Sequence, residues 1–183
     1  MTTTEKRVFT QEEQERIDNN KSINVDNDWW HECTIEGFSE DMEAIGVSDF
    51  EFSFSGFWSQ GDGASFTGSV SNLEKFLVTV TDLSPLFIEM IQEDISIGFR
   101  RTSHHYCHEN TCTTNISWDG EDKIVLLDKL ELQIEFEMAP IIAKIEKQIE
   151  EWREGKCKEF YRALEKEYDF LTTDEEVWET LNQ

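Results

Sequence analysis

The chain has 183 residues, of which 40 are Asp or Glu and 16 are Lys or Arg, giving a formal net charge of −24 at pH 7. A conventional nucleic-acid-binding face and binding to an anionic membrane are both disfavoured, because each needs clustered Lys and Arg. Thirteen Phe and six Trp supply apolar surface for a packed core, which argues against general disorder.

The first 25 residues are polar and are predicted to form an N-terminal arm, with residues 26–183 as a single domain. Thr10 and Glu13 indicate a short capped helix in this arm. The N-terminus has no apolar stretch of the signal-peptide kind, and no segment reaches the length of a transmembrane helix. We therefore expect a cytoplasmic protein whose four cysteines are free thiols.

Residues 27–46 show a helical apolar period, with Asn27 or Asp28 as the cap and Gly46 at the end. Alternation follows in residues 50–55, where Phe50, Phe52 and Phe54 are separated by polar residues, and Gly56-Phe57-Trp58 extends the run. A second alternating run in residues 64–70 follows a glycine-rich turn. Residues 49–70 are therefore predicted to form a β-hairpin with one apolar face.

Residues 71–94 are predicted to be helical, with Ser71 as N-cap and a break at Ser84-Pro85. A second hairpin is predicted over residues 95–118, with its turn at His108-Glu109-Asn110. Helical spacing then predicts long C-terminal helices over about 122–181. The apolar stripe that begins them is Ile124, Leu127, Leu130, Ile134 and Met138, and a break is expected at Ala139-Pro140.

The predicted order of elements is α-ββ-αα-ββ-long α with a helical C-terminus. We interpret it as an α+β fold in which two β-hairpins form one antiparallel sheet packed against helices.

The glycine-rich turn lies in the string FSGFWSQGDGASF, residues 54–66. A structural interpretation is that Gly61 and Gly63 permit a tight loop while the aromatics fill the core. A functional interpretation is that the loop binds a partner through Trp58, Ser59, Gln60 and Asp62. It is not a phosphate-binding loop, because it lacks the Gly-Lys-Ser sequence and leads into a strand.

The second unusual string, residues 100–112, contains three of the four histidines and two of the four cysteines. A strand would place adjacent histidines on opposite faces, and Cys107 and Cys112 lack the CxxC spacing, so no zinc site is predicted. No spacing identifies a nucleophile with its base, so no catalytic residue is predicted either. The string is predicted to be a polar hairpin site with the residues Arg100, His105, Tyr106, His108 and Glu109.

The C-terminal helix is dense in carboxylates. Glu150 and Glu154 are one helical turn apart, a spacing comparable to that of DNA phosphates, so this helix is a candidate DNA mimic. An aromatic interface centred on Trp58 or Trp178 is the alternative.

Three motifs together resemble a family of proteins common in bacteriophage genomes: the 54–66 loop, the Tyr106-to-Asn110 hairpin, and the tail LEKEYDFLTTDE over residues 164–175. The resemblance runs from about Phe54 to Glu176, roughly two-thirds of the chain. Thr173 stands where the family pattern has Ser.

The resemblance implies a phage-type inhibitor of host defence, with a type II CRISPR nuclease as the candidate target. The expected partner is a host protein with a basic nucleic-acid groove, with no cofactor, no direct duplex DNA binding and no membrane. Two alternatives stay open. One is a phage housekeeping protein that binds RNA or a nucleotide through the hairpin loops. The other is a metal-dependent enzyme that uses the His/Cys hairpin.

Overall fold

The computed structural model describes residues 7–103, 105–127 and 133–183, which fall into two compact units. The first unit, the terminal unit, combines the described residues up to Glu36 with Arg162–Gln183. The second, the sheet unit, is Gly37–Tyr161. Helices α2 (Glu32–Ala44) and α5 (Met138–Leu171) contribute residues to both. The fold is α+β with a helical C-terminus, as predicted.

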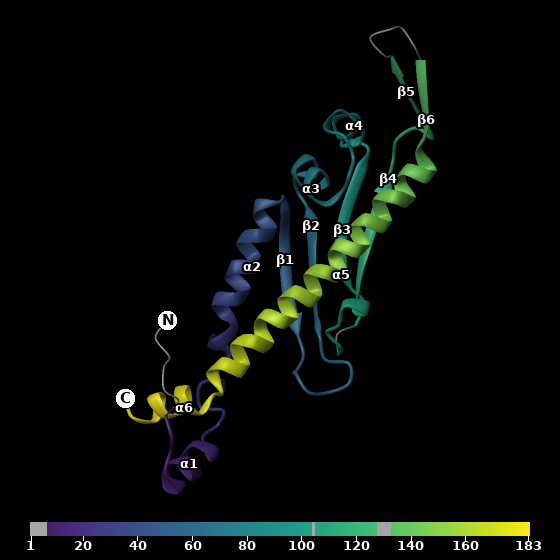
Figure 1. Cartoon of the computed structure of the whole chain (residues 1–183). Helices are drawn as coiled ribbons and strands as arrows, with labels where there is room; N and C mark the ends of the chain where they lie inside the picture. The colour runs from purple at the N-terminus through teal and green to yellow at the C-terminus, as the bar shows by residue number, and fades with distance from the viewer. Residues whose placement is uncertain (1–6, 104, 128–132) are drawn as a thin grey trace. The chain divides into compact units, whose positions relative to one another are not determined.

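The sheet unit is built on four antiparallel strands in the order β1-β2-β3-β4 (Figure 1). The strands are β1 (Val47–Phe54), β2 (Ala64–Val70), β3 (Ile95–Arg101) and β4 (Cys112–Trp118). Strands β1 and β2 form the first predicted hairpin, and β3 and β4 form the second. Pairing of Gly68 with Phe99 and of Ser69 with Gly98 joins the hairpins into one sheet, which confirms that prediction.

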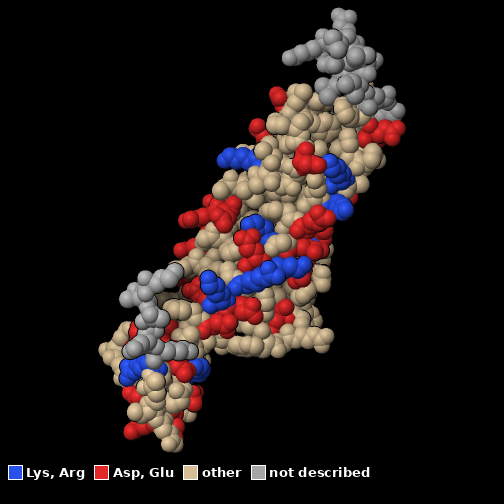
Figure 2. Space-filling view, in the orientation of Figure 1, with Lys and Arg blue, Asp and Glu red and all other residues tan. Residues whose placement is uncertain are grey.

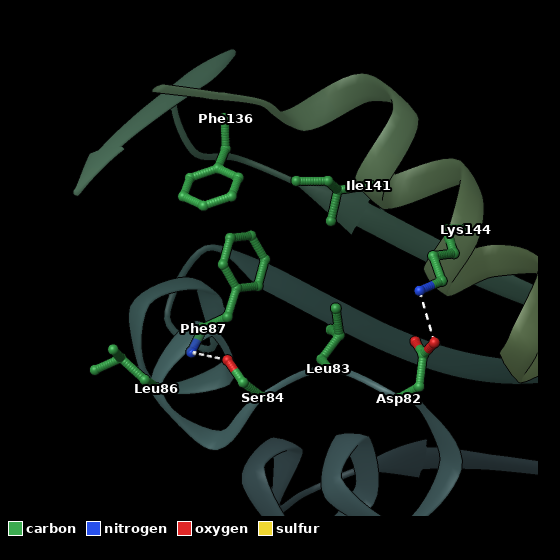
Figure 3. Close-up of a pocket in the computed structure, with 8 residues that line it drawn as sticks. All are labelled: Asp82, Leu83, Ser84, Leu86, Phe87, Phe136, Ile141 and Lys144. Carbon is green, nitrogen blue, oxygen red and sulfur yellow. Dashed lines mark hydrogen bonds and ion pairs between the residues drawn. The ribbon is translucent and has the colours of Figure 1, made fainter. Parts of the chain in front are cut away.

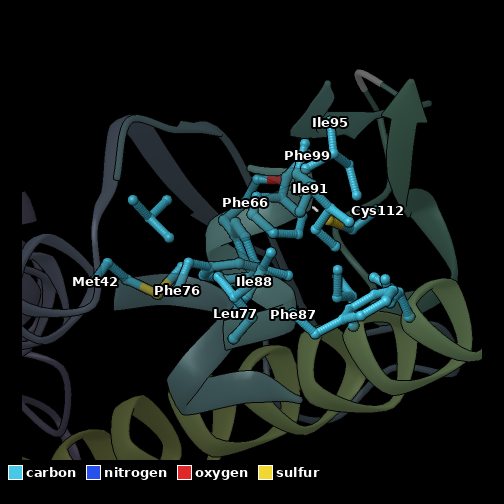
Figure 4. Close-up of a cluster of buried hydrophobic side chains, with 14 of the residues drawn as sticks. Met42, Phe66, Phe76, Leu77, Phe87, Ile88, Ile91, Ile95, Phe99 and Cys112 are labelled. Carbon is cyan, nitrogen blue, oxygen red and sulfur yellow. Dashed lines mark hydrogen bonds between the residues drawn. The ribbon is translucent and has the colours of Figure 1, made fainter. Parts of the chain in front are cut away.

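One face of this sheet is apolar and covered. In β3, Ile95, Ile97 and Phe99 are buried while Ser96 and Arg100 are exposed. Helices α3 (Leu73–Val80), α4 (Pro85–Ile91) and α5 add their buried side chains to the same cluster (Figure 4). Each large apolar side chain buried in this way contributes roughly 1.5–3 kcal/mol.

The short helices α3 and α4 have N-caps of the predicted kind, but the cap of α3 lies one residue later than predicted. Ser84 caps α4 and Pro85 occupies its first turn, as predicted. Helix α3 is capped by Asn72, not Ser71, because the Asn72 side chain accepts the Lys75 N–H. The Ser71 hydroxyl instead donates to the Gly46 carbonyl, where Gly46 turns the chain with φ +88°.

The prediction of helix is wrong for residues 123–127 and 133–137. These two segments form strands, β5 (Lys123–Leu127) and β6 (Gln133–Glu137), which pair antiparallel in a separate two-stranded sheet. The alternation of Ile134 and Phe136 with polar neighbours is a strand period, and it fits the pleat better than the helical stripe. Leu130 of that stripe lies outside the described residues.

Helix α5 therefore starts at Met138, and the break expected at Ala139-Pro140 does not occur. Pro140 lies in the first turn, where no intrahelical N–H bond is lost. Beyond Met138 the predicted helix is confirmed, and its side chains Ile145, Ile149 and Phe160 are buried. Helix α6 (Asp174–Leu181) follows and is capped by Thr173, which accepts the Glu176 N–H.

The terminal unit joins the two ends of the chain. Helix α1 (Gln11–Asp18), capped by Thr10 as predicted, packs on α6, with Ile17 and Val177 fully buried. The Arg16 guanidinium donates to the Leu181 carbonyl at 2.8 Å. A short 3-10 helix, η1 (Asp28–His31), precedes α2 and is capped by Asn27. No helix among the described residues is long and apolar enough to cross a membrane.

Candidate functional site

The glycine loop between β1 and β2 is closed by its own side chains. The Asp62 carboxylate accepts the Ser59 N–H at 2.5 Å, and the Asp62 N–H donates to the Ser59 carbonyl. Gly61 between them has φ +99°, a conformation that favours glycine. Asp62 thus shapes the turn, while Trp58, Ser59 and Gln60 are exposed on it.

The connection between β3 and β4 differs from the extended hairpin predicted for it. Strand β3 ends at Arg101, and a short 3-10 helix, η2 (Glu109–Thr111), precedes β4. The strand predicted to place neighbouring residues on opposite faces is therefore wrong for residues 105–108. His104 lies outside the described residues. His108 caps η2, its Nδ1 accepting the Asn110 N–H at 3.2 Å.

The two unusual strings of the sequence meet at one end of the sheet (Figure 1). The Ser55 hydroxyl donates to the Cys107 carbonyl at 3.2 Å and accepts the Gly63 N–H at 3.1 Å. A Cβ on Gly63 would lie 3.0–3.1 Å from atoms of Cys107 and His108. Gly63 is therefore required by this close approach of the two loops, and not by a positive φ.

Helix α5 contacts both loops through its side chains. The Tyr161 hydroxyl donates to the Gly56 carbonyl at 3.0 Å, and its ring packs 5.5 Å from that of Phe57. The Arg153 guanidinium donates to the Glu109 carbonyl at 2.5 Å, and the Glu109 carboxylate lies 3.5 Å from Lys158 Nζ. Arg153 and Tyr161 were not predicted to belong to the site, because nothing in the helical period distinguishes them.

Arg153 also organises a buried polar cluster. Its side chain is only 2% exposed and forms ion pairs with Glu150 and, at 3.9 Å, with Glu154. Hydrogen bonding to Arg153 lowers the pKa of Glu150. The neighbouring Cys157 thiol, with help from Arg153, lowers the pKa of Cys112 to about 6. Hydrogen bonding to Cys112 and burial raise the pKa of Cys157.

The carboxylates proposed to mimic DNA are mostly paired with cations. Glu150 also accepts a hydrogen bond from Thr114, and Glu154 lies 3.6 Å from Lys158. Further pairs along α5 join Lys147 to Glu151 and Lys156 to Glu159. Figure 2 accordingly shows acidic and basic side chains interspersed over one face of the molecule.

Trp178, the other aromatic predicted to bind a partner, is half-buried within the terminal unit. Its ring packs 5.8 Å from that of Phe9, and the guanidinium groups of Arg7 and Arg16 lie over it at 4.7 and 5.7 Å. This packing joins α6 to the segment around α1. The position of Trp178 therefore has a structural explanation.

Two large aromatic side chains are instead exposed on the joined loops. Trp58 is 74% exposed, and Tyr106 is 58% exposed beside His105, with ring centroids 4.7 Å apart. We call five exposed residues of the two loops the loop surface; they are Trp58, Ser59, Gln60, His105 and Tyr106. Of the other residues predicted for the polar hairpin, Arg100 is exposed on β3, whereas His108 and Glu109 are partly buried.

Metal binding finds no ready geometry in the part of the chain that the structure describes. Within it, no three His, Cys, Asp or Glu side chains are grouped to hold an ion. Cys112 is buried, and its thiol donates to the Phe66 carbonyl at 3.1 Å, away from the loop surface.

A cavity of about 300 Å³ lies elsewhere in the sheet unit, between α4, β6 and α5 (Figure 3). Its apolar lining includes Leu86, Phe87 and Ile141, and an ion pair of 2.7 Å joins Asp82 to Lys144 beside it. Such a cavity can hold an apolar group but presents no catalytic constellation.

Comparison with known protein families places the sheet unit in a described family. A family model described as a domain of unknown function, DUF8835, matches residues 30–174, a range that includes the whole sheet unit with both loops and α5. No curated protein and no solved structure matches the chain.

Proposed function

The chain belongs to the DUF8835 family, a domain family of unknown function. From the geometry of the two loops, we propose that the protein binds a protein partner through the loop surface. One observation carries the proposal: two loops from different hairpins are held together by Ser55 and Gly63 and expose Trp58 and Tyr106. Exposed aromatics on a rigid support are typical centres of protein interfaces.

The backbone that bears Trp58 is held rigidly, which favours a role in binding over a role as a solvated connection. Hydrogen bonds within the glycine loop, the Ser55–Cys107 bond and the Tyr161–Gly56 bond each restrict the backbone that bears Trp58. A preorganised loop has less conformational entropy to lose on binding. Less of the free energy gained by burying the aromatic side chains is then offset by the cost of ordering the loop.

For the partner, we propose a host defence protein that handles nucleic acid, with a type II CRISPR nuclease as the first candidate. The resemblance to phage proteins supports this choice, and the charge of −24 supports a basic partner through long-range steering. The pairing of α5 carboxylates with Lys and Arg favours the loop surface over DNA mimicry as the primary contact.

The test measures target-DNA cleavage by a type II CRISPR nuclease as the purified protein is added. Trp58→Ala and Tyr106→Ala should each weaken inhibition by roughly tenfold or more, the usual effect of removing a central aromatic. Trp29→Ala is the matched control, because Trp29 is 76% exposed in the terminal unit. It should inhibit like the wild type.

Capture from bacterial lysate distinguishes the remaining outcomes. A protein retained after nuclease treatment by the wild type, and lost with Trp58→Ala, supports the proposal even if the target is another defence protein. Recovery of RNA as the retained component would contradict it and favour the housekeeping alternative. Equal behaviour of Trp58→Ala and Trp29→Ala in every assay would overturn the assignment to the loop surface.

A further inference from the structure

The two edges of the four-stranded sheet are built differently. At the β1 edge, the pairing with β2 shifts register between Ser48 and Glu51, and Asp49 adopts a positive φ of 51° at this bulge. Asp49 and Glu51 also bring carboxylates to this strand. Bulges and charges are the devices by which sheets prevent an edge from pairing with another chain.

The β4 edge has none of these devices. Its seven residues pair with β3 without a register shift, and the strand CTTNISW contains no charged residue and no proline. Among the described residues, β4 has β3 as its only strand neighbour. An edge of this length and regularity is a template for a further strand.

The alternation of hydrogen bonds shows which groups face outward. The Thr102 N–H donates to the Thr111 carbonyl at 2.7 Å, and the Asp119 N–H donates to the Asp94 carbonyl at 2.8 Å. Between these two points, every second residue of β4 forms backbone hydrogen bonds with β3, and the backbone groups of the other residues point away from β3. The backbone groups of Thr114 and Ile116 therefore point to the open side.

A groove of about 550 Å³ runs between this edge and α5. Its strand wall consists of Thr113, Thr114 and Ile116, and its helix wall consists of Ala143, Glu146, Lys147 and Glu150. An extended chain in this groove would have a strand edge on one side and helix side chains on the other. That arrangement is the one used when a peptide adds a strand to a sheet.

We infer that the β4 edge binds an extended, basic peptide segment of a partner protein as an added strand. The helix wall carries Glu146, Glu150 and Lys147; Glu150 pairs with Arg153 and Lys147 with Glu151, so Glu146 is the groove carboxylate with no ion pair among the described residues. The whole chain carries −24, so a basic segment is attracted. A second copy of this chain would bring the same charge, and like-charge repulsion disfavours it as the occupant.

The test uses the full chain and a pool of ten-residue peptides with Lys or Arg at alternate positions and random residues between them. Peptides should be retained by the immobilised protein, and a retained peptide should protect the Thr114 and Ile116 amides from hydrogen exchange. Ala143→Trp fills the groove from an exposed helix position and should weaken binding about tenfold.

Two charge variants give a matched comparison that does not depend on filling the groove. Glu146→Lys changes an exposed groove residue and should weaken binding several-fold, whereas Glu89→Lys makes the same change on α4, outside the groove, and should not. Trp58→Ala should bind the peptide normally, so this site and the loop surface can fail independently.

Three outcomes would overturn the inference. The pool is not retained, or the retained peptides bind wild type and Ala143→Trp equally well. In the third outcome, sedimentation shows that the protein alone dimerises and protects the Thr114 and Ile116 amides, which would make the occupant a second copy.

Discussion

At the residue scale, Arg153 is the most buried charge in the part of the chain that the structure describes, and its partners determine its energetic role. It bonds the Glu150 carboxylate and the Glu109 carbonyl, which belongs to the loop that presents Tyr106. A buried charge is tolerated only when it is paired and hydrogen-bonded. The same contacts that offset its desolvation therefore also hold the β3–β4 connection against α5.

Replacing Glu150 should change the acid stability of the protein. Because hydrogen bonding to Arg153 lowers its folded-state pKa, the Glu150 carboxylate stabilises the fold above its unfolded pKa of about 4.3, and this contribution is lost as pH falls through the lower folded value. Glu150→Gln should therefore cost about 1–2 kcal/mol at pH 7, a modest figure because Glu150 is half-exposed. The difference from wild type should shrink below about pH 4.3.

Urea unfolding at pH 7 and at stepwise lower pH measures this difference. Glu151→Gln is the control, because Glu151 is exposed and paired only at 3.8 Å with Lys147 among the interactions described. A Glu150→Gln cost that stays constant with pH would contradict the ionic role of Glu150.

The two glycines of the first loop should respond to substitution for different reasons. Gly61→Ala should cost about 1 kcal/mol, because φ is positive although the space around it is open. Gly63→Ala should cost about 1–3 kcal/mol, because its Cβ would press on the backbone of Cys107 and His108. Chemical denaturation gives both values. Only Gly63→Ala should also impair partner binding, since only Gly63 lies between the two loops.

At the element scale, the predictable parts of the fold are those in which one local pattern suffices. The alternation of Phe50, Phe52 and Phe54 fixed the first hairpin, and Ser84-Pro85 placed the start of α4. Residues 122–137 satisfied a helical and a strand period at once, so their pairing as β5 and β6 could not be read from the stripe alone.

The candidate site was predictable in its parts but not in its assembly. Trp58 and Tyr106 lay in strings singled out as unusual, yet the contact between those strings depends on Ser55 and Gly63 meeting Cys107 and His108. These residues are about 50 positions apart, and their meeting follows from the β2–β3 pairing, for which a single sequence carries no local signal. The burial of Arg153 was equally invisible, because surface helices commonly carry Arg.

Trp178 should matter for the terminal unit and not for partner binding. Trp178→Ala removes the ring that packs on Phe9, Arg7 and Arg16 and should lower stability by about 1–3 kcal/mol. Amide exchange in α1 should accelerate while exchange in β2 and β3 stays slow. Trp29→Ala in the same unit is the control. If Trp178→Ala abolished partner binding while amide exchange in α1 stayed as slow as in the wild type, Trp178 would instead belong to the partner interface.

At the scale of the whole molecule, the chain carries a net charge of −24, but α5 is not a uniform acidic stripe, because Lys and Arg pair with several of its carboxylates. Long-range attraction of a basic partner survives this arrangement, because it depends on net charge. The same arrangement makes α5 a poor mimic of a phosphate backbone, because the neighbouring lysines neutralise the local negative potential.

Charge reversal on α5 separates these two effects. Glu151→Lys with Glu159→Lys alters two exposed positions of the predicted mimic helix. If the loop surface dominates, this double variant should bind the partner within roughly threefold of wild type, mainly through slower association. A steep loss of affinity with salt, together with competition by DNA, would restore mimicry. Titrations from low to high salt with both proteins give the comparison.

The pairing of α1 with α6 has a consequence for how the protein is made. The sheet unit is one continuous stretch, Gly37–Tyr161, whereas the terminal unit needs residues from both sides of it. A ribosome delivers Gly37–Tyr161 in full before it delivers α6, so the sheet can bury its core cotranslationally. Helix α1, synthesised before the sheet unit, must wait until α6 has left the ribosome before Ile17 meets the helix that covers it.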